Sequence, residues 1–229
     1  MSSYYNEFDP FAAAWLRELI KDGQIADGEV DERSIVDVRP DDLRGFTQCH
    51  FFAGIGGWSY ALRLAGWPDD APVWTGSCPC QPFSSAARGR NGRLQDDRHL
   101  WPAWYRLIAA NSPGTVFGEQ VAASDDWFTG VCDDLEAVDY DIGAAILPAV
   151  AVGCDHARHR LYFVGHTDSH RESVRAVHAE ASRLSRACGD TGRVALEDGV
   201  PARVAFRGFG NAIVPPLAAE FIKAYIECR

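Results

Sequence analysis

The sequence predicts an α/β fold with a mostly parallel, twisted sheet and helices on both faces of the sheet. Short apolar runs of strand length alternate with stretches of helical periodicity along most of the 229 residues. A glycine-rich turn, Gly54-Ile55-Gly56-Gly57, follows one such run and precedes a helical stretch, as is typical of strand-to-helix connections in parallel sheets. The length fits one full-sized domain.

Six runs are expected to be strands because they are short, apolar or β-branched, and bounded by polar or turn-forming residues. They are residues 34–38, 48–53, 73–77, 115–117, 144–147 and 161–164. Four helices are expected between and after these strands, at residues 9–21, 58–65, 99–110 and 216–227. The first begins with Asp9-Pro10, a capping residue followed by the residue favoured in a first turn. One face of this helix, expected to be buried, carries Phe11, Trp15, Leu19 and Ile20.

Composition excludes several classes of protein. The chain is 47% hydrophobic and 24% charged, an ordinary globular balance. The longest apolar stretch, residues 141–153, is too short to span a bilayer, and no signal peptide is visible at the start. Seven scattered cysteines suit a reducing compartment better than a disulfide scaffold. We therefore expect a cytoplasmic protein, without a membrane partner, in a bacterial or phage-infected cell.

Charge is unevenly distributed, although the net charge of −10 argues against a wholly basic, nucleic-acid-binding surface. Residues 1–48 hold eleven acids against five bases, and residues 119–141 hold eight acids and no base. Residues 86–106 and 156–207 are net basic, and their positive charge comes from arginine alone. Arginine suits forked contacts to phosphates and base edges. The pattern fits a protein that binds a polyanion on one face, or ordinary solvated charge.

Two segments carry chemistry. Glycines in Phe51–Gly57 would let the backbone turn sharply and approach a ligand closely, although plain strand-to-helix turns look similar. In Gly76-Ser77-Cys78-Pro79-Cys80-Gln81-Pro82, a cysteine at a strand tip is held on a proline-flanked loop, which suits an exposed nucleophile. A structural cysteine or half of a metal site is the alternative, but the Cys-x-Cys spacing is not that of a zinc site.

Together these segments resemble the DNA cytosine-5 methyltransferases, whose hallmarks are an FxGxGG cofactor loop and a Pro-Cys-Gln nucleophile loop. Three further blocks resemble that family: Gly118-Glu119-Gln120-Val121, the Arg-x-Arg of His156–Tyr162, and Gly208–Pro215 with its Gly-Asn pair. Gln120 stands where the family has asparagine. The resemblance implies the Rossmann-like fold of S-adenosylmethionine-dependent methyltransferases, with S-adenosyl-L-methionine as cofactor.

The order of the blocks departs from the family. Only 21 residues separate Gly57 from Pro79, where the family normally has two further strands and a helix. Residues 6–13 resemble the family's second block and residues 34–43 its third, so a circularly permuted order is expected. The catalytic domain would then be residues 1–165 plus 208–229, with residues 1–47 as the permuted cofactor-binding segment. The alternative is that residues 1–48 are an unrelated cap.

The resemblance implies a reaction and a role for each matching residue. Cys80 would add to C6 of a cytosine flipped out of double-stranded DNA, and Glu119 would protonate or hydrogen-bond N3. C5 then takes the methyl group, a base removes the C5 proton, and Cys80 leaves. Arg158 and Arg160 would hold O2 of the base and the neighbouring phosphate; a solvated strand edge is the alternative for both.

The same resemblance implies which residues bind the cofactor and the DNA. Glu7 would hold the ribose of the cofactor, Phe52 would lie against the adenine, and Ser34 takes the place of the aspartate that usually contacts the adenine. The other expected cofactor residues are Gly54, Ile55, Gly56, Gly57, Asn211 and Val214. The loop expected to close over DNA carries Gln81, Ser84, Arg88, Arg90, Arg93 and Arg98. Trp58 could line the cofactor pocket, but it is better explained as a core residue.

A second departure concerns specificity. The family places a large target-recognition region between the Arg-x-Arg block and the terminal block, whereas here residues 166–207 form only a short insert. Specificity is therefore expected to be low or to come from a partner or a homodimer. A non-catalytic relative that binds DNA or cofactor, and an RNA cytosine-5 methyltransferase, remain alternatives. The intact set Cys80, Glu119, Arg158 and Arg160 favours an active enzyme.

Overall fold

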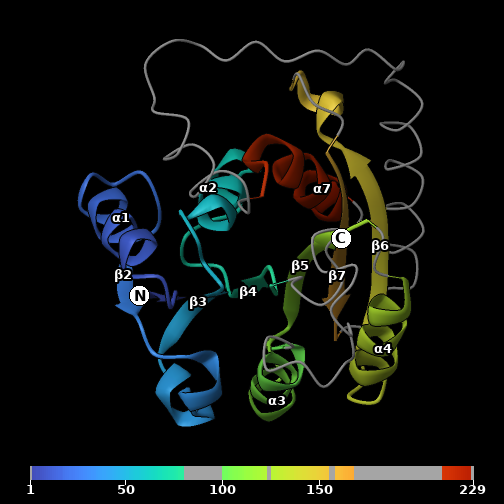
Figure 1. Ribbon diagram of the computed structural model, residues 1–229, viewed down its shortest axis with the longest axis horizontal. Coiled ribbons are helices and arrows are strands. Elements are labelled where there is room, and N and C mark those ends of the chain that lie inside the picture. The colour runs from blue at the N-terminus through green and yellow to red at the C-terminus, as the bar shows by residue number, and fades with distance from the viewer. Residues whose placement is uncertain (1, 80–99, 123–124, 155–157, 168–212, 228–229) are drawn as a thin grey trace, which may run out of the picture.

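The computed structural model describes residues 2–79, 100–122, 125–154, 158–167 and 213–227. Its centre is a seven-stranded sheet in the order β2-β1-β3-β4-β5-β7-β6, and Figure 1 shows the strands in that order from left to right. The strands are β1 (Ser2–Asn6), β2 (Gly28–Asp31), β3 (Phe46–Phe51), β4 (Val73–Gly76), β5 (Thr115–Val121), β6 (Asp141–Pro148) and β7 (His159–His166). β1 to β5 pair in parallel, and β7 runs antiparallel to both β5 and β6. The predicted mostly parallel α/β fold is confirmed.

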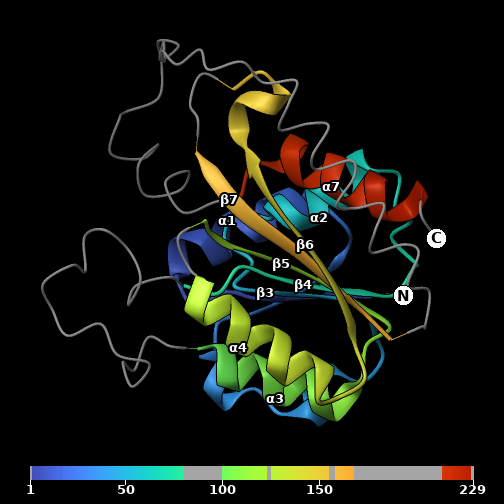
Figure 2. The ribbon, with the colours of Figure 1, turned by 90° about the vertical axis from the view of Figure 1, so that its right-hand side faces the viewer.

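Helices cover both faces of the sheet (Figure 2). The helices α3 (Trp101–Asn111) and α4 (Asp125–Glu136) lie on one face, and α1 (Pro10–Lys21), α2 (Gly57–Leu64) and α7 (Pro215–Glu227) lie on the other. Short 3₁₀ helices complete the described chain: η1 (Ile35–Asp37), η2 (Pro40–Leu43) and η4 (Ala149–Val152). No described helix is long and apolar enough to cross a membrane.

Two large apolar clusters hold the layers together. On the α3 side, Trp101, Trp104 and Leu107 pack with Phe51 and Trp74 of the sheet. On the other side, Trp58 of α2 and Phe221 of α7 pack with sheet residues that include Phe117 and Tyr162. Aromatic rings meet edge to face in both clusters, for example Trp101 with Trp104 at 5.6 Å between centroids. These clusters fix the loops at the strand ends, where the candidate site lies.

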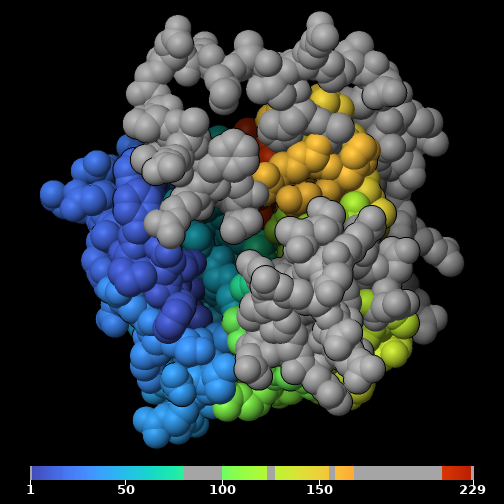
Figure 3. All heavy atoms as spheres, viewed as in Figure 1, coloured from blue at the N-terminus to red at the C-terminus, as the bar shows by residue number. Residues whose placement is uncertain are grey.

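The N-terminal residues are part of this sheet. β1 lies between β2 and β3 and pairs with both, and Tyr5 is fully buried with Leu16 and Ile25. Residues 1–48 are therefore not a cap separate from the sheet, because they supply two of its strands, and their correspondence to the family's second and third blocks stays a prediction. In the space-filling view the N-terminal segment, in blue, forms one side of the molecule (Figure 3).

Two local expectations are wrong. Residues 34–38, predicted as a strand, contain the 3₁₀ helix η1, and the strand in this region is β2, whose Glu29 and Asp31 gave no apolar signal. In α1 the expected burial is wrong for two of the four residues: Phe11 is 59% and Trp15 49% exposed, whereas Leu19 and Ile20 pack against the core. The fully buried residues of this helix are Ala13 and Leu16. The Asp9 cap is confirmed, because its side chain accepts hydrogen bonds from the backbone N–H groups of Phe11 and Ala12.

Candidate active site

The carboxyl ends of the parallel strands meet at one edge of the sheet, and predicted site residues follow these ends. Glu7 follows β1, the glycine turn follows β3 and Ser77 follows β4. Because β7 is antiparallel to β5, its first residues lie at the same edge, with Arg160 paired to Val121 at the end of β5. Open α/β sheets bind their ligands at this edge.

The glycine turn is closely packed. Gly54 and Gly56 have φ angles of 55° and 81°, which favour glycine. A Cβ at Gly57 would lie 2.8 Å from Ile213 Cγ1, so the start of the C-terminal segment packs directly against the turn. Val214, the adjacent predicted cofactor residue, is half-buried.

Phe52 precedes this turn in a strained conformation. Its φ is 50°, an angle that side-chain-bearing residues rarely adopt and that concentrates at functional sites. The ring is half-buried and meets Trp104 edge to face, with 6.2 Å between centroids. Ile55, within the turn, is also half-buried. Both side chains are thus partly accessible beside the turn.

Glu7 connects the end of β1 to the glycine turn. Its Oε2 accepts a hydrogen bond of 2.6 Å from the Gly54 backbone N–H, and its Oε1 accepts one of 2.8 Å from the Asp9 N–H. The preceding residue, Asn6, donates from Nδ2 to the carbonyl oxygens of Asp31 and Arg33. The ends of β1, β2 and β3 are therefore joined by side chains, and the segments that carry Glu7, Ser34 and Gly54 lie together.

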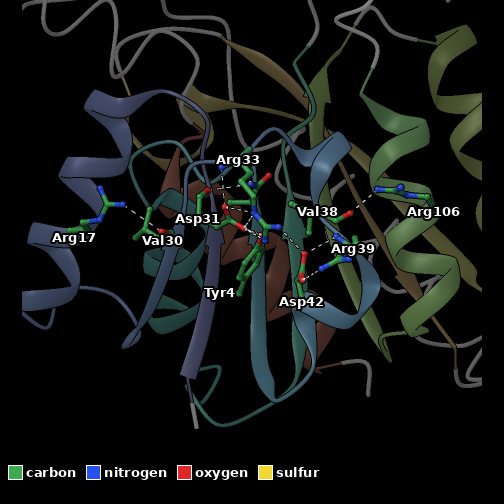
Figure 4. A network of polar contacts seen from close by, with 10 residues as sticks. Tyr4, Arg17, Val30, Asp31, Arg33, Val38, Arg39, Asp42 and Arg106 are labelled. Atoms are coloured by element: carbon green, nitrogen blue, oxygen red, sulfur yellow. Dashed lines mark hydrogen bonds and ion pairs between the residues drawn. The ribbon is translucent and has the colours of Figure 1, made fainter.

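The residues that follow β2 are held by a polar network (Figure 4). Arg33 bridges Asp31 at 2.7 Å and Asp42 at 3.0 Å, and the Tyr4 hydroxyl donates to Asp31 at 2.7 Å. Burial raises the pKa of Asp31, but hydrogen bonds from Arg33 and Tyr4 outweigh burial and keep this pKa below its ordinary value. Arg33 and Asp31 therefore fix the turn on which Ser34 sits.

Ser34 caps η1, since its Oγ accepts a hydrogen bond of 3.4 Å from the Val36 N–H. Arg106 of α3 holds the same segment from the other side by donating to the carbonyl oxygens of Val36 and Val38, at 3.3 and 2.8 Å. Arg106 lies at the end of the basic segment 86–106 identified in the sequence, and here its guanidinium supports the backbone around η1. Its charge is used within the fold.

The loop after β4 begins with Ser77 and Cys78. Cys78 is 6% exposed, and burial raises the pKa of its thiol well above the ordinary value, which makes it a poor nucleophile. Pro79 is exposed. Of the two cysteines in Cys-Pro-Cys, Cys78 is thus a core residue, and the predicted nucleophile Cys80 lies outside the described residues.

Glu119, on β5, is buried and ion-paired. It is 6% exposed, and its Oε1 lies 2.9 Å from Arg160 Nε on β7. Burial raises the pKa of Glu119, and the charges of Arg160 and Arg158 with a hydrogen bond from Ser77 offset part of that rise. Such a carboxyl group keeps its proton to a higher pH than an ordinary glutamate does, as a proton donor requires.

Arg158 precedes β7 and is half-buried. Burial lowers the pKa of its guanidinium, Arg160 lowers it further, and Glu119 opposes both effects. The two arginines and Glu119 therefore form one electrostatic group. The structure thus brings these two predicted residues together with Glu119, and the contact of either arginine with a nucleic acid stays a prediction.

Gln120 links the two segments that are predicted to be catalytic. Its Nε2 donates to the Cys78 carbonyl oxygen at 3.4 Å, and its Oε1 accepts from the Val121 N–H at 2.9 Å. The residue is 2% exposed. The side chain that stands where the family has asparagine thus connects β5 to the backbone of the loop that leads to Cys80.

Other predicted residues lie outside the described part of the chain. They are the nucleophile Cys80, the cofactor residue Asn211, and the DNA-loop residues Gln81, Ser84, Arg88, Arg90, Arg93 and Arg98. The recognition insert at residues 166–207 also falls almost entirely outside it. Among the described residues, no group of three or more His, Cys, Asp or Glu side chains could hold a metal ion.

Trp58 and Ser77 have no catalytic role predicted from the sequence, yet both contact the site. The Trp58 indole N–H donates to Ser77 Oγ at 3.0 Å, and Ser77 hydrogen-bonds Glu119. Trp58 is 3% exposed, as expected of a core residue. The only signal in the sequence is a hydroxyl residue at the tip of a strand, directly before the nucleophile loop.

A family model described as C-5 cytosine-specific DNA methylase matches residues 67–195, more than half of the chain. No curated protein sequence matches. Among solved structures, a mutant of Spodoptera frugiperda DNMT2 has a TM-score of 0.50 at 16% identity, covering 72% of this chain and 42% of that chain. The S. pombe Dnmt2 methyltransferase has a TM-score of 0.48 at 15% identity, covering 82% and 48%. The Entamoeba histolytica methyltransferase EhMeth has a TM-score of 0.45 at 15% identity, and the match covers 75% of this chain and 54% of that chain. The chain spans about half the length of these proteins, and at such identity the first similarity concerns the fold alone.

Proposed function

The chain belongs to the C-5 cytosine-specific DNA methylase family, and from that premise we propose that it transfers a methyl group from S-adenosylmethionine to C5 of cytosine in DNA. The buried pair of Glu119 and Arg160 carries the proposal. It lies at the carboxyl edge of the sheet, one strand away from the loop that leads to Cys80. A carboxyl group with a raised pKa beside an arginine suits proton donation to a ring nitrogen.

The described residues fit the cofactor. An acid at the end of β1 lies against a glycine turn at the end of β3, and a Cβ at Gly56 would meet Ile25 and Leu16 at 3.2 and 3.3 Å. We propose that Glu7 holds the ribose hydroxyls and that Phe52 lies against the adenine. The turn residues, Ser34, Val214 and Asn211 would complete the site. S-adenosylmethionine, when bound, supplies the methyl group on a sulfonium centre.

The reaction assigns a task to each side chain. The Cys80 thiolate adds to C6 of the cytosine while Glu119 gives its proton to N3, so that electron density builds at C5, which then takes the methyl group. A base removes the C5 proton, N3 returns its proton to Glu119, and the C6–sulfur bond breaks to release Cys80. Arg160 orients the Glu119 carboxyl group, and Arg158 with Arg160 supplies positive charge for O2 of the base and a nearby phosphate.

We also infer that the chain is a permuted member of the family. Between Gly57 and β4 the chain holds only α2 and a short loop. The two strands and the helix that the family has at this point of the sequence would correspond here to β1, β2 and α1. β1 instead enters the sheet from the N-terminus and pairs beside β3. The N-terminal segment would thus fill the position that the family's second and third blocks occupy in space.

The substrate that we propose is DNA. DNA is named by the family model, whereas an RNA substrate would use the same active-site chemistry. The basic loop 81–98 would close over the substrate, and a partner or a second copy would supply specificity that a short insert cannot. The alternative, from a different functional class, is a relative that binds DNA or cofactor but no longer catalyses methyl transfer.

The test is methyl transfer from S-adenosylmethionine labelled on the methyl group, with mixed-sequence duplex DNA and mixed RNA offered separately. Wild-type protein is compared with Cys80→Ala, which lacks the nucleophile, and with Cys132→Ala, a control cysteine on α4. We expect label on cytosine C5 of DNA with wild type and Cys132→Ala, and none with Cys80→Ala.

Label on RNA alone would mean that the substrate is RNA and not DNA, and that the reaction is the one proposed. Cofactor binding without label on either polymer would contradict the enzyme assignment and favour a non-catalytic relative. An active Cys80→Ala variant would contradict the assigned nucleophile.

A further inference from the structure

Ser77 lies between two residues of the site that come from different elements. Its Oγ is 3.0 Å from Nε1 of Trp58 on α2. Gly76 pairs with Gly118 in the parallel register of β4 and β5, so the next residues, Ser77 and Glu119, lie side by side, and the Ser77 side chain is within hydrogen-bonding reach of the Glu119 carboxyl group. Trp58 is 3% and Glu119 6% exposed. The Ser77 hydroxyl, on a half-buried residue, thus lies between two buried groups.

The chemistry of the three groups sets the direction of both hydrogen bonds. An indole N–H can only donate, so Ser77 Oγ must be the acceptor of the bond from Trp58. This leaves the one hydroxyl proton of Ser77 for Glu119, whose carboxylate can only accept. Trp58 therefore selects the hydroxyl rotamer that donates to Glu119.

We propose that Ser77 is a positioning residue for Glu119, with Trp58 fixing the direction of its hydroxyl. The inference rests on the proposed function, in which Glu119 gives a proton to the cytosine ring. Ser77 does not touch the reacting atoms in this scheme, and it acts through the carboxyl group that does.

The sheet explains why a second donor is needed. β5 lies between β4 and β7. Arg160 on β7 holds Glu119 Oε1 from one side at 2.9 Å, and Ser77 holds the carboxyl group from the β4 side. Because a single contact leaves the terminal torsion of glutamate broad, the donor from the opposite side fixes the plane of the carboxyl group.

Ser77 also couples Glu119 to the nucleophile loop. It stands three positions before Cys80, and the carbonyl oxygen of the intervening Cys78 accepts from Gln120 Nε2 at 3.4 Å. Two contacts thus join adjacent residues of the loop to adjacent residues of β5. The start of the loop that leads to Cys80 is consequently joined to the strand that carries Glu119.

The charged and titratable groups that face Glu119 among the described residues come from β7 and its start: Arg158, Arg160 and Tyr162. Burial raises the pKa of Glu119, whereas the two arginines and the Ser77 hydroxyl favour its ionised form. Tyr162, whose own pKa burial raises, stays neutral. Removing the Ser77 hydroxyl should therefore raise the pKa of Glu119 further.

The experiment is a ¹³C NMR titration of protein labelled at the glutamate carboxyl carbons, with the Glu119 signal assigned by Glu119→Gln. Four variants are compared with wild type: Ser77→Ala, Ser77→Thr, Trp58→Phe and Trp67→Phe. Trp67 is a matched control, since its buried indole donates to the Ala71 carbonyl oxygen at 3.2 Å and not to the site. Neither DNA nor cofactor is needed.

We expect Ser77→Ala to raise the pKa of Glu119, Trp58→Phe to raise it less, and Ser77→Thr and Trp67→Phe to leave it near the wild-type value. In methyl transfer, Ser77→Ala should lower kcat about tenfold, the worth of one charge-assisted hydrogen bond, with Ser77→Thr restoring it. The fall in rate on the alkaline side should move to higher pH, because protonated Glu119 is the active form.

An unchanged pKa of Glu119 in Ser77→Ala, or equal shifts in Trp58→Phe and Trp67→Phe, would overturn the inference. Failure of the proposed function is seen separately. If wild type transfers no methyl group to DNA or RNA while the NMR pattern is as expected, Ser77 still orients Glu119 and the assigned reaction is wrong.

Discussion

Glu7 Oε2 accepts a hydrogen bond of 2.6 Å from the Gly54 backbone N–H, across 47 positions of the chain. The acid therefore shapes the glycine turn in addition to its proposed contact with ribose. Its two oxygens each accept one backbone hydrogen bond, and each retains a lone pair for a hydroxyl donor.

Replacing Glu7 should therefore weaken binding of S-adenosylmethionine. In Glu7→Ala the charged acceptor for the ribose hydroxyls and the partner of Gly54 are both lost, and we expect Kd to rise by about 10- to 100-fold. Isothermal titration calorimetry measures the change. Glu18→Ala is the control, because Glu18 is an exposed acid on α1 that pairs with Lys21. Equal Kd values for Glu7→Ala and wild type would contradict the assigned ribose contact.

Much of this site could be predicted from sequence because short motifs carry it. The glycine turn and the strand ends are local features, so the glycine turn after β3, the start of the loop after β4 and the acid on β5 could be predicted in their order. The edge strand β2 could not be, since its Glu29 and Asp31 face solvent or a salt bridge and leave no apolar run. Its neighbour Ile35 is buried in a 3₁₀ turn, and a buried apolar residue in such a turn resembles a strand residue in sequence.

The side-chain contacts between different strands and helices could not be predicted from the sequence. The exposure of Phe11 and Trp15 depends on how α1 is rotated over β1 and β2, which periodicity alone does not determine. Helix α4 was not predicted, because its acidic residues obscured Trp127, Val131 and Leu135, which are spaced four apart and buried. The Ser77 contacts arise only where three separate elements meet.

Glu119 should lower the stability of the folded protein at neutral and alkaline pH. Its pKa is raised on folding, so the folded state binds the proton more tightly than the unfolded state. The associated stability is complete below the unfolded pKa and is lost as pH rises through the folded pKa. Glu119→Gln, which imitates the protonated acid, should therefore melt about 3 °C above wild type at pH 8 and equal to it in acid.

Differential scanning calorimetry at pH 5 and pH 8 measures this difference. Asp31→Asn is the opposite case, because the pKa of Asp31 is lowered on folding and loss of its charge should reduce the melting temperature at pH 8. A lower melting temperature for Glu119→Gln at both pH values would mean that attraction to Arg160 outweighs the burial of Glu119.

His50 should make the fold sensitive to acid. Its ring is 1% exposed on β3, stacks on Tyr5 with 4.8 Å between centroids, and contacts Thr75 Oγ1 through Nδ1 at 2.8 Å. Burial lowers the pKa of His50 to about 3. The stability that neutral His50 provides is complete above its unfolded pKa and is lost as pH falls from about 6.5 towards the folded value.

We expect the free energy of unfolding to fall by up to about 1.4 kcal/mol for each pH unit below 6, from this residue alone. Urea unfolding of wild type and His50→Phe between pH 7.5 and 4.5 measures it, and the variant should lose this part of the slope. His159→Gln, at an exposed position, should keep the wild-type slope. If His50→Phe and wild type show parallel curves, His50 is not the acid-sensitive group.

The proposed permutation leads to a prediction about the whole sheet. The starts of β1, β3 and β4 lie at one edge, as shown by the pairing of Ser2 with Phe46 and of Gln48 with Val73. Asp69 and Asp70, just before β4, are exposed. A chain rearranged to residues 46–69, then 1–45, then 70–229, with short glycine–serine linkers at the two new junctions, can therefore form the same strand pairs.

This rearranged protein should bind S-adenosylmethionine with nearly the wild-type Kd and melt within a few degrees of wild type, since only connections at exposed loops change. Calorimetry and circular dichroism check both. Deletion of residues 1–45 is the control, and it should abolish cooperative unfolding because it removes β1 and β2 and exposes the edge of β3. A rearranged chain that fails to fold or to bind cofactor, beside a wild type that does both, would show that the N-terminal segment depends on its present connection.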